Sequence, residues 1–321
     1  MEAFVFAVNA VLPIMLLVFL GYGLKRIGFV PAAFAPMANK LVFRVFLPVT
    51  LFLNVYGISS EMSIGIGYIL YAMVTVFVFF GLGNLLVVLV TKGNRRAPLL
   101  QSVFRSNFAL IGIPLAEALY GSEGVAVAAL LSAVAIPLYN VLAVLCFSIH
   151  SEGKRLNLGK ILRDIAKNPL IIGVLTGALF LLAKNQLPGF ALERAVPLYK
   201  TLSYLSGMAT PLALITLGAQ FEFSAVRGLR REIVTGVLCR LVIVPFLAIG
   251  TAYLLRSFTG AHFAAFIALY ASPVAVSSVP MAQELGGDSE LAGQLVVWTT
   301  LVSALTIFLF SFGLKSLGVF A

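Results

Sequence analysis

The chain is long and very apolar: of its 321 residues, 61% are hydrophobic and only 11% are charged. A soluble domain of this size needs more charge to cover its surface, so the composition excludes the soluble classes and indicates an integral membrane protein. The formal net charge of +10 resides mainly in short loops, which membrane topology explains better than nucleic-acid binding does. The apolar runs have the length of helices, and this excludes an outer-membrane barrel.

The apolar runs follow one another without a long linker or a soluble domain. Most are close to the roughly twenty residues that a helix needs to cross ~30 Å of hydrocarbon. The first run follows Glu2 directly, with no basic residue before it, so we interpret it as a span and not as a signal peptide. We predict an all-α polytopic membrane protein with ten transmembrane helices near 4–24, 36–57, 64–91, 98–120, 124–148, 168–184, 198–219, 232–255, 262–283 and 290–313.

Basic residues alternate between the connections of this predicted series. Fourteen Lys and Arg residues lie in one set of alternate connections and four in the other set. The positive-inside rule assigns the richer set to the cytoplasm. We therefore predict a cytoplasmic connecting loop at 149–167 and two non-cytoplasmic termini, in a protein of the cytoplasmic membrane.

The fourth predicted span carries polar and helix-breaking residues: Arg105, Asn107, Gly112 and Pro114. Proline removes a backbone donor and clashes with the carbonyl four residues before it, and glycine weakens the helix beside it. In hydrocarbon, a broken helix is tolerated only where protein or a water-filled cavity satisfies the freed polar groups. We predict a broken helix with Asn107 as a hydrogen-bonding group at a polar site. A packing kink with an internally satisfied Asn is the alternative.

The second half of the chain repeats the first. The segment IPLAEALYGSEG at 113–124 aligns without a gap with VPMAQELGGDSE at 279–290, and this places Pro114 on Pro280. Five spans per half is an odd number, so the second copy has to enter the membrane inverted. We predict a first repeat over 1–148 and a second over 168–321. Inverted repeats with paired Gly/Pro-interrupted spans are typical of secondary transporters that bind substrate near the midplane.

The polar residues around the two interrupted spans predict the chemistry of the ligand. The N-terminal ends of broken helices carry roughly half a positive charge each, which suits a carboxylate. An Arg inside a span usually faces the bundle or a cavity, although snorkelling or structural pairing is the alternative for each of the two candidates. The predicted substrate-binding residues are Asn107, Gly112, Pro114, Ser277, Ser278, Pro280, Arg105, Arg240 and Asn140.

The run NFALIGIP at 107–114, followed by Tyr120 and Gly121, resembles the fourth-span signature of the auxin efflux carrier family. That family includes plant auxin exporters and bacterial permeases for malonate, malate and similar acids. The resemblance implies crossing fourth and ninth helices, a homodimeric scaffold of spans 1, 2, 6 and 7, and a mobile transport unit of spans 3–5 and 8–10. The long middle loop of the plant members is missing here, which favours a bacterial permease for a mono- or dicarboxylate.

Several alternatives remain open from the sequence. A channel with the same fold is one, and a sodium-coupled symporter similar to the sodium–bile acid symporters is another, with Glu117, Gln283 and Glu284 as candidate ion ligands. The coupling ion is then H+ or Na+, or there is none. The sequence shows no His-Glu metal set, no Ser/Lys or paired-Asp constellation and no phosphate-binding loop. We therefore expect no enzymatic activity, metal, cofactor or nucleic-acid partner.

Overall fold

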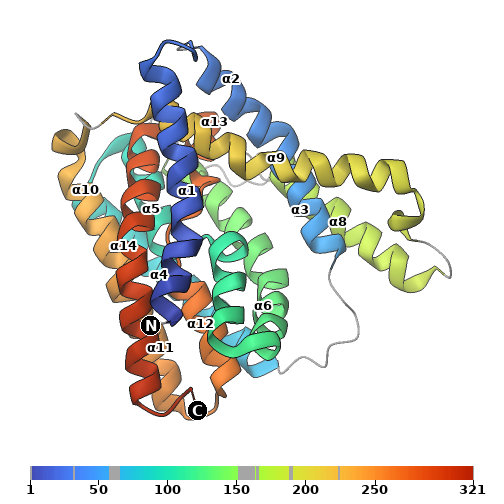
Figure 1. Ribbon diagram of the computed structural model, residues 1–321, viewed down its shortest axis with the longest axis vertical. Coiled ribbons are helices and arrows are strands. Elements are labelled where there is room, and N and C mark those ends of the chain that lie inside the picture. The colour runs from blue at the N-terminus through green and yellow to red at the C-terminus, as the bar shows by residue number, and fades with distance from the viewer. Residues whose placement is uncertain are drawn as a thin grey trace.

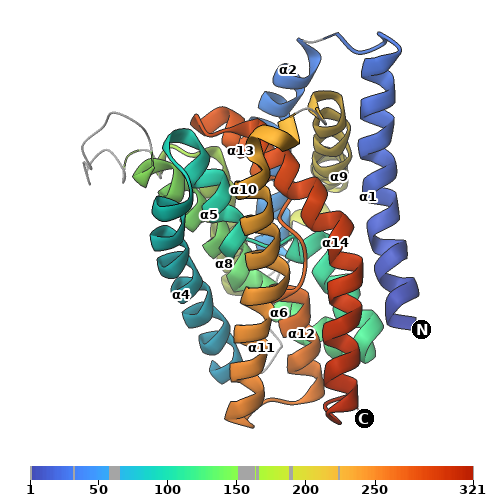
Figure 2. The same ribbon diagram turned by 90° about the vertical axis from the view of Figure 1, so that its left-hand side faces the viewer.

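The computed structural model describes residues 2–31, 33–57, 66–150, 163, 166–187, 191–222 and 225–320. Within these residues the molecule consists of helices and connections, with one isolated antiparallel bridge between Ser106 and Val274. The long helices lie side by side (Figure 1), and the turned view shows the same bundle from its left-hand side (Figure 2). α1 begins and α14 ends toward the end of the molecule opposite α2 and α13.

The described helices, in chain order, are α1 (Glu2–Arg26), α2 (Phe34–Leu41), η1 (Val42–Phe46), α3 (Leu47–Tyr56), α4 (Ile66–Val90), η2 (Gly93–Arg95), α5 (Arg96–Phe104), η3 (Phe108–Gly112), α6 (Ile113–Ile149), α8 (Pro169–Gln186), η4 (Leu192–Arg194), α9 (Val196–Gln220), α10 (Val226–Leu238), η6 (Cys239–Ile243), α11 (Val244–Leu255), α12 (Gly260–Tyr270), α13 (Ser278–Leu285) and α14 (Ser289–Ser316). The label α6 covers two helices, because Tyr120 and Gly121 have non-helical backbone angles. Gly121 has a φ of +57°, in the left-handed region that favours glycine.

Seven segments of the described part are long and apolar enough to cross a membrane. They correspond to the second, third, fifth, sixth, seventh, eighth and tenth runs of the sequence analysis. The first run forms α1, and the fourth and ninth runs form interrupted helices; of these three runs, only the end of the fourth lies in one of the seven segments, Leu115–Ile149. An all-helical integral membrane protein is thus confirmed, whereas the count of ten spans stays a prediction.

Three short π-helices, η1, η3 and η6, have a common cause in the sequence. Each is centred on the residue four positions before a proline, whose ring would clash with that residue's carbonyl in a regular α-helix. A π-turn widens the helix locally and accommodates the proline without ending the helix. The three pairs are Arg44 and Pro48, Leu110 and Pro114, and Leu241 and Pro245.

The two interrupted helices break at other places than predicted. The first break lies at Arg105–Asn107, between α5 and η3, and not at Gly112 and Pro114. The second break follows α12 and includes Pro273, but Pro280 is the third residue of α13. A proline in the first turn of a helix is tolerated because the N–H it lacks has no intrahelical partner there.

The two breaks meet inside the molecule. The backbone N–H of Asn107 donates to the carbonyl of Pro273 at 2.7 Å, beside the Ser106–Val274 bridge. The N–H of Val274 donates in turn to Thr299 Oγ1 of α14 at 3.1 Å. Backbone groups that the breaks release from helical pairing are therefore satisfied by the opposite break and by α14. The two interrupted segments thus face each other, as the crossing of the fourth and ninth helices that the family resemblance implies would require.

Glycines bring two pairs of helices into backbone contact. Gly218 of α9 packs on the carbonyl of Val18 in α1, and Gly173 of α8 packs on that of Pro48 in α3. Small residues at a helix interface let the backbones approach closely, which stabilises packing in lipid. These contacts fix α1 against α9 and α8 against α3.

We predict that Gly218→Ala destabilises the protein, since the new Cβ would overlap the Val18 carbonyl. Overpacking of this kind costs about 1–3 kcal/mol of the free energy of unfolding. Gly207→Ala is the matched control, because Gly207 lies in the same helix and a Cβ there would meet no neighbouring atom within 4 Å. Thermal melts of both variants in detergent, followed by circular dichroism, check this; equal melting temperatures would contradict it.

Candidate functional site

A cavity of about 210 Å³ lies at the meeting point of the two breaks. We refer to it as the crossing cavity. Its walls come from both breaks and from α3, α6, α8 and α9. Neither Asp nor Glu is among its described lining residues. Its polar lining residues are Thr50, Asn54, Arg105, Ser106, Asn107, Tyr139, Asn140, Thr210 and Ser277.

Arg105 places a buried positive charge at this cavity. Its guanidinium donates from Nη2 to Asn140 Oδ1 at 2.9 Å and to Ser277 Oγ at 2.8 Å, and from Nη1 to Gln101 Oε1 at 3.0 Å. The residue is 4% exposed, and no carboxylate among the described residues forms an ion pair with it. A desolvated cation held only by neutral groups is costly, and an anion entering the cavity would relieve that cost.

Asn107 adds a hydrogen-bond donor to the same wall. The residue is 8% exposed, and its side-chain Nδ2 has no hydrogen-bond partner among the described residues. A buried donor without a partner costs about 1–3 kcal/mol, so it favours a ligand that accepts from it. Asn107 also precedes η3 as its N-cap residue, at the positive end of the helix that continues into α6.

The helix ends at the crossing differ in whether a side chain neutralises their partial charge. α5 and α12 end there with their carbonyls, whereas η3–α6 and α13 begin there with their N–H groups. Arg240 lies against the carbonyl ends: Nε donates to Ser272 at 2.9 Å, and Nη2 donates to Leu269 and to Tyr270 at 2.7 Å each. Its Nη1 reaches Val103 of α5 at 3.3 Å. The negative ends are therefore neutralised, and the positive ends and Arg105 set the potential of the crossing cavity.

The crossing cavity gathers four of the predicted binding residues, Arg105, Asn107, Asn140 and Ser277. Arg240, Gly112, Ser278 and Pro280 are not among its described lining residues. Arg240 is fully buried, and its bonds to four carbonyls make it a structural residue and not a ligand contact. Each break precedes the helix that contains the predicted proline, so the residues of the break itself, 105–107 and 275–277, line the cavity.

The four other predicted binding residues lie within the helices that follow the breaks. Gly112 packs between Phe108 and the Ala268 carbonyl, so it serves close helix packing. Ser278 and Pro280 are buried in α13 without lining the cavity, and Ser278 Oγ has no partner in the described part of the chain. Pro114 stands in the first turn of α6, and its side chain is outside the described residues.

The three predicted ion ligands do not come together. Gln283 accepts from Asn39, and Glu284 pairs with Arg44, both near the end of the molecule that carries α2 and α13. Glu117 is exposed and lies one turn before Tyr120, whose ring packs on Phe320 near the opposite end. The helices that follow the two breaks run away from the crossing in opposite directions. Glu117 of one helix therefore lies far from Gln283 and Glu284 of the other, and the three do not form one ion site. No cluster of three metal-binding side chains occurs among the described residues.

Several lining residues were missed by the sequence analysis as ligand groups, including Thr50, Asn54 and Thr210. Thr50 and Thr210 flank the prolines at 48 and 211, which correspond roughly between the two halves of the chain. The correspondence of the second and seventh predicted spans was therefore the signal that could have pointed to them. Nothing in the sequence alone shows that α3 and α9 face the two breaks.

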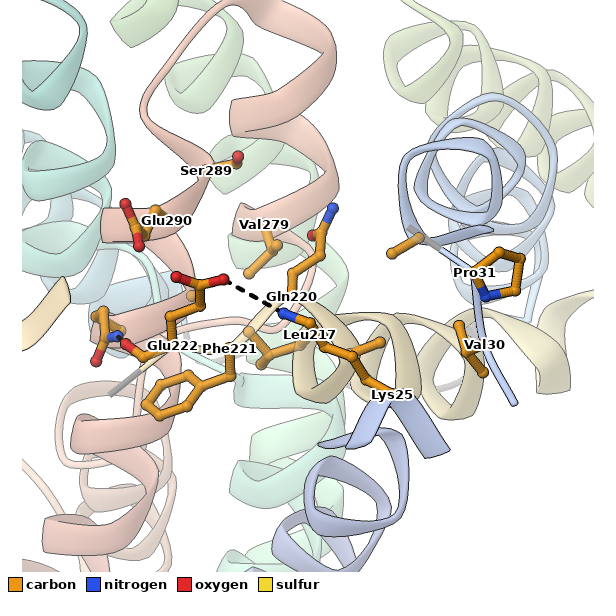
Figure 3. Close-up of a pocket in the computed structure, with 14 residues that line it drawn as sticks. Lys25, Val30, Pro31, Leu217, Gln220, Phe221, Glu222, Val279, Ser289 and Glu290 are labelled. Carbon is orange, nitrogen blue, oxygen red and sulfur yellow. Dashed lines mark hydrogen bonds and ion pairs between the residues drawn. The ribbon is translucent and has the colours of Figure 1, made fainter. Parts of the chain in front are cut away.

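A second cavity, of about 530 Å³, opens at the end of the molecule that holds α2 and α13 (Figure 3). We refer to it as the end cavity. It is lined by Lys25, the connection from α1 to α2, the end of α9, and parts of α13 and α14. Lys25 Nζ and Glu222 Oε1 form an ion pair across it at 3.4 Å, with side chains 40% and 56% exposed. A pair this exposed contributes little to stability.

A helical bundle with apolar spans and a polar, cationic cavity at two interrupted helices defines a polytopic membrane transport protein. A comparison with known families agrees. The sequence pattern of the family described as membrane transport protein matches residues 6–311, so the chain belongs to this family, the auxin efflux carrier family.

Its relatives come from archaea and bacteria. An "Uncharacterized transporter" of Methanothermobacter thermautotrophicus is 26% identical over 317 residues, covering 96% of this chain and 98% of that protein. A second "Uncharacterized transporter", of Methanocaldococcus jannaschii, is 28% identical and covers 68% of this chain and 70% of its own. A "Putative malonate transporter" of Rhizobium meliloti is 27% identical over 320 residues, with 92% of each chain covered.

We predict that Arg240→Met strongly destabilises the protein, because it leaves four buried carbonyls without their donor. Each unsatisfied buried group costs about 1–3 kcal/mol. Arg240→Lys keeps the charge but not the planar fork, so an intermediate loss is expected. Arg26→Met is the control, since Arg26 is exposed and bonds to Tyr22. Melting temperatures in detergent rank the variants; a ranking with Arg26→Met lowest would refute the role of Arg240.

Proposed function

We propose that the protein is a secondary transporter that carries a small organic acid anion, a mono- or dicarboxylate such as malonate or malate, across the cytoplasmic membrane. One observation carries the proposal: the guanidinium of Arg105 is buried at a cavity whose described lining residues include no acidic side chain, beside Asn107 Nδ2, which has no partner among the described residues. The name of the relative from Rhizobium meliloti, a "Putative malonate transporter", supports the same class of cargo.

The chemistry of the cavity suits a carboxylate group. A guanidinium offers five N–H donors, and within the described part of the chain the side-chain contacts of Arg105 engage the four of Nη1 and Nη2, which leaves Nε–H for a ligand. A carboxylate accepts charge-assisted hydrogen bonds from Arg and from the Asn107 amide, which are stronger than neutral ones. The hydroxyl groups of Thr210 and Ser277 line the same space and can donate to a second carboxylate, whereas the Thr50 hydroxyl donates to backbone carbonyls.

The fold that we propose has ten spans in two inverted repeats, over 1–148 and 168–321, joined by a cytoplasmic loop at 149–167. Two contacts support it. The breaks meet in an antiparallel bridge, as two copies related by inversion would. Close glycine contacts join α1 to α9 and α8 to α3, which are the first with the seventh and the sixth with the second predicted span. Inversion would exchange these two pairs.

Alternating access would move one part of the molecule against the other around the crossing cavity. One wall consists of α3, α8 and α9, which belong to the proposed scaffold of spans 1, 2, 6 and 7. The other wall consists of the two breaks and α6, which belong to the proposed transport unit of spans 3–5 and 8–10. A homodimer joined through the scaffold, with both termini non-cytoplasmic, completes the proposal.

We predict that purified protein in liposomes takes up radiolabelled malonate in a saturable manner. Asn107→Ala and Arg105→Gln should each lower the uptake by tenfold or more, about the effect of losing one charge-assisted hydrogen bond in the cavity. Asn84→Ala is the control, because Asn84 lies on α4 and bonds to the Phe80 carbonyl and His150, away from the cavity.

Two outcomes would contradict this proposal. Unaltered uptake in both site variants would remove the assigned site. Unitary currents in planar bilayers without saturation would indicate the channel alternative. Replacing external Na+ by choline, and varying the pH, in the same uptake assay decides whether Na+ or H+ is coupled.

We also predict that malonate stabilises the wild-type protein against heat. At one hundred times its Kd, a ligand that binds only the folded state adds about 2.7 kcal/mol to the free energy of unfolding. Arg105→Gln should lose this stabilisation, whereas Asn84→Ala should keep it. A thermal-shift series against mono- and dicarboxylates, with and without Na+, measures the effect and ranks the acids; equal stabilisation of wild type and Arg105→Gln would exclude the crossing cavity as the binding site.

A further inference from the structure

A buried cluster of amide and hydroxyl side chains joins three helices between the two cavities. Asn39 of α2 is fully buried, and its Nδ2 donates to Gln283 Oε1 of α13 at 2.8 Å and to Gln220 Oε1 of α9 at 3.2 Å. Its Oδ1 accepts from Thr216 Oγ1 of α9 at 2.7 Å. We refer to Asn39, Thr216, Gln220 and Gln283 as the Asn39 cluster. A neighbouring ion pair joins the same two parts of the chain: Arg44, five residues after Asn39, pairs at 3.0 Å with Glu284, the residue after Gln283.

The order of lining residues along α9 places the cluster between the cavities. Thr210 and Ala213 line the crossing cavity, Thr216 follows one turn later, and Leu217 and Gln220 line the end cavity. Figure 3 shows Leu217 and Gln220 at the wall of the end cavity. The Thr216 side chain is 0% exposed, so it reaches neither space.

The same order holds along α2, η1 and α3. Ala35 lines the end cavity, Asn39 follows one turn later, and the crossing cavity begins at Leu47 and extends to Asn54. At the second break, Ser277 lines the crossing cavity and Val279 lines the end cavity. On α9, and along α2 to α3, the Asn39 cluster therefore lies between the residues that line one cavity and those that line the other, whereas on α13 Gln283 lies one turn beyond Val279, on the side of the end cavity.

The cluster joins parts of the molecule that differ in how firmly they are held. α9 is fixed to α1 by backbone contact at Gly218. α13 has only eight residues and follows a break in its helix, so it can shift as a unit relative to α12. The bonds from Asn39 to Gln283 and from Arg44 to Glu284 are thus contacts between a fixed wall and a hinged one. Amide hydrogen bonds between side chains are readily exchanged for bonds to water, which suits a contact that has to open repeatedly.

We propose that the Asn39 cluster is the gate between the end cavity and the crossing cavity, and that it is closed in this structure. The proposal rests on the proposed transport function, because it assigns the end cavity as the entry or exit for the same anion. Opening separates Gln283 from Asn39 and moves α13 away from α2. The four side chains of the cluster carry no charge, and the neighbouring Glu284 carboxylate is paired with Arg44 in the closed arrangement.

Cysteine labelling tests the gate without using any substrate. The reporter is Thr210→Cys in the crossing cavity, in a chain whose buried Cys146 and Cys239 are replaced by serine. Ser289→Cys at the end cavity, in a separate sample, identifies which membrane preparation, spheroplasts or inverted vesicles, exposes that side to a membrane-impermeant thiosulfonate reagent. The rate at which the reporter reacts from that side is then measured.

Gln283→Ala and Asn39→Ala should each raise this rate by about tenfold, as expected when the hydrogen bond between Asn39 and Gln283 that holds the closed state is removed. Gln294→Ala is the matched control and should leave the rate unchanged, because Gln294 lines the end cavity but bonds to the Glu222 carbonyl and Trp298. Gln283 is only half-buried, so its variant decides the test if Asn39→Ala fails to fold.

Unchanged rates in the folded variants, or an equal rise in Gln294→Ala, would overturn the gate. This experiment tests the gate independently of the proposed transport of malonate. A raised rate together with absent malonate uptake in the wild type would leave the gate in place and reject malonate. Normal uptake with unchanged rates would reject the gate alone.

Discussion

The whole arrangement depends on how Arg240 satisfies the ends of two broken helices inside the membrane. Its guanidinium bonds to carbonyls at the ends of α5 and α12, from a position on η6 that no water reaches. Unsatisfied carbonyls and an unpaired cation are both costly in hydrocarbon, and here each removes the cost of the other. The two helices can therefore remain interrupted at the centre of the molecule. A continuous helix would pair all its backbone groups internally and present none of them to a ligand.

Once the negative helix ends are neutralised, the crossing cavity has a defined electrostatic character. Arg105 lies at it with no acidic partner among the described residues, and the helices that begin there add their positive ends. Two arginines of similar burial thus have opposite roles: one is fully engaged by the protein, and the other is held by neutral groups that leave its charge uncompensated. This difference underlies the proposal that the cavity binds an organic anion.

The two kinds of helix packing divide the structure into fixed and adaptable parts. Glycine contacts bring α1 onto α9 and α8 onto α3 with the backbones touching, and such contacts admit little sliding. The short helix α13 buries residues 278–282 in the core, and farther along it Gln283 and Glu284 contact α2 and η1 through side-chain bonds to Asn39 and Arg44. A cavity whose walls belong to both parts is placed where relative motion would open or close it.

The sequence by itself determined the class of the protein, most of its apolar spans, and the two segments that interrupt a helix, because hydropathy and proline chemistry act locally. It also indicated Arg105, Asn107, Asn140 and Ser277, which line the cavity. It misplaced the breaks by several residues, since a π-turn or a first helical turn accommodates a proline within a helix. Only the tertiary structure decided that Arg240 is structural, that Thr50 and Thr210 face the breaks, and that Glu117 lies far from Gln283. Those outcomes depend on which side chains distant helices bring together, and no local pattern encodes that.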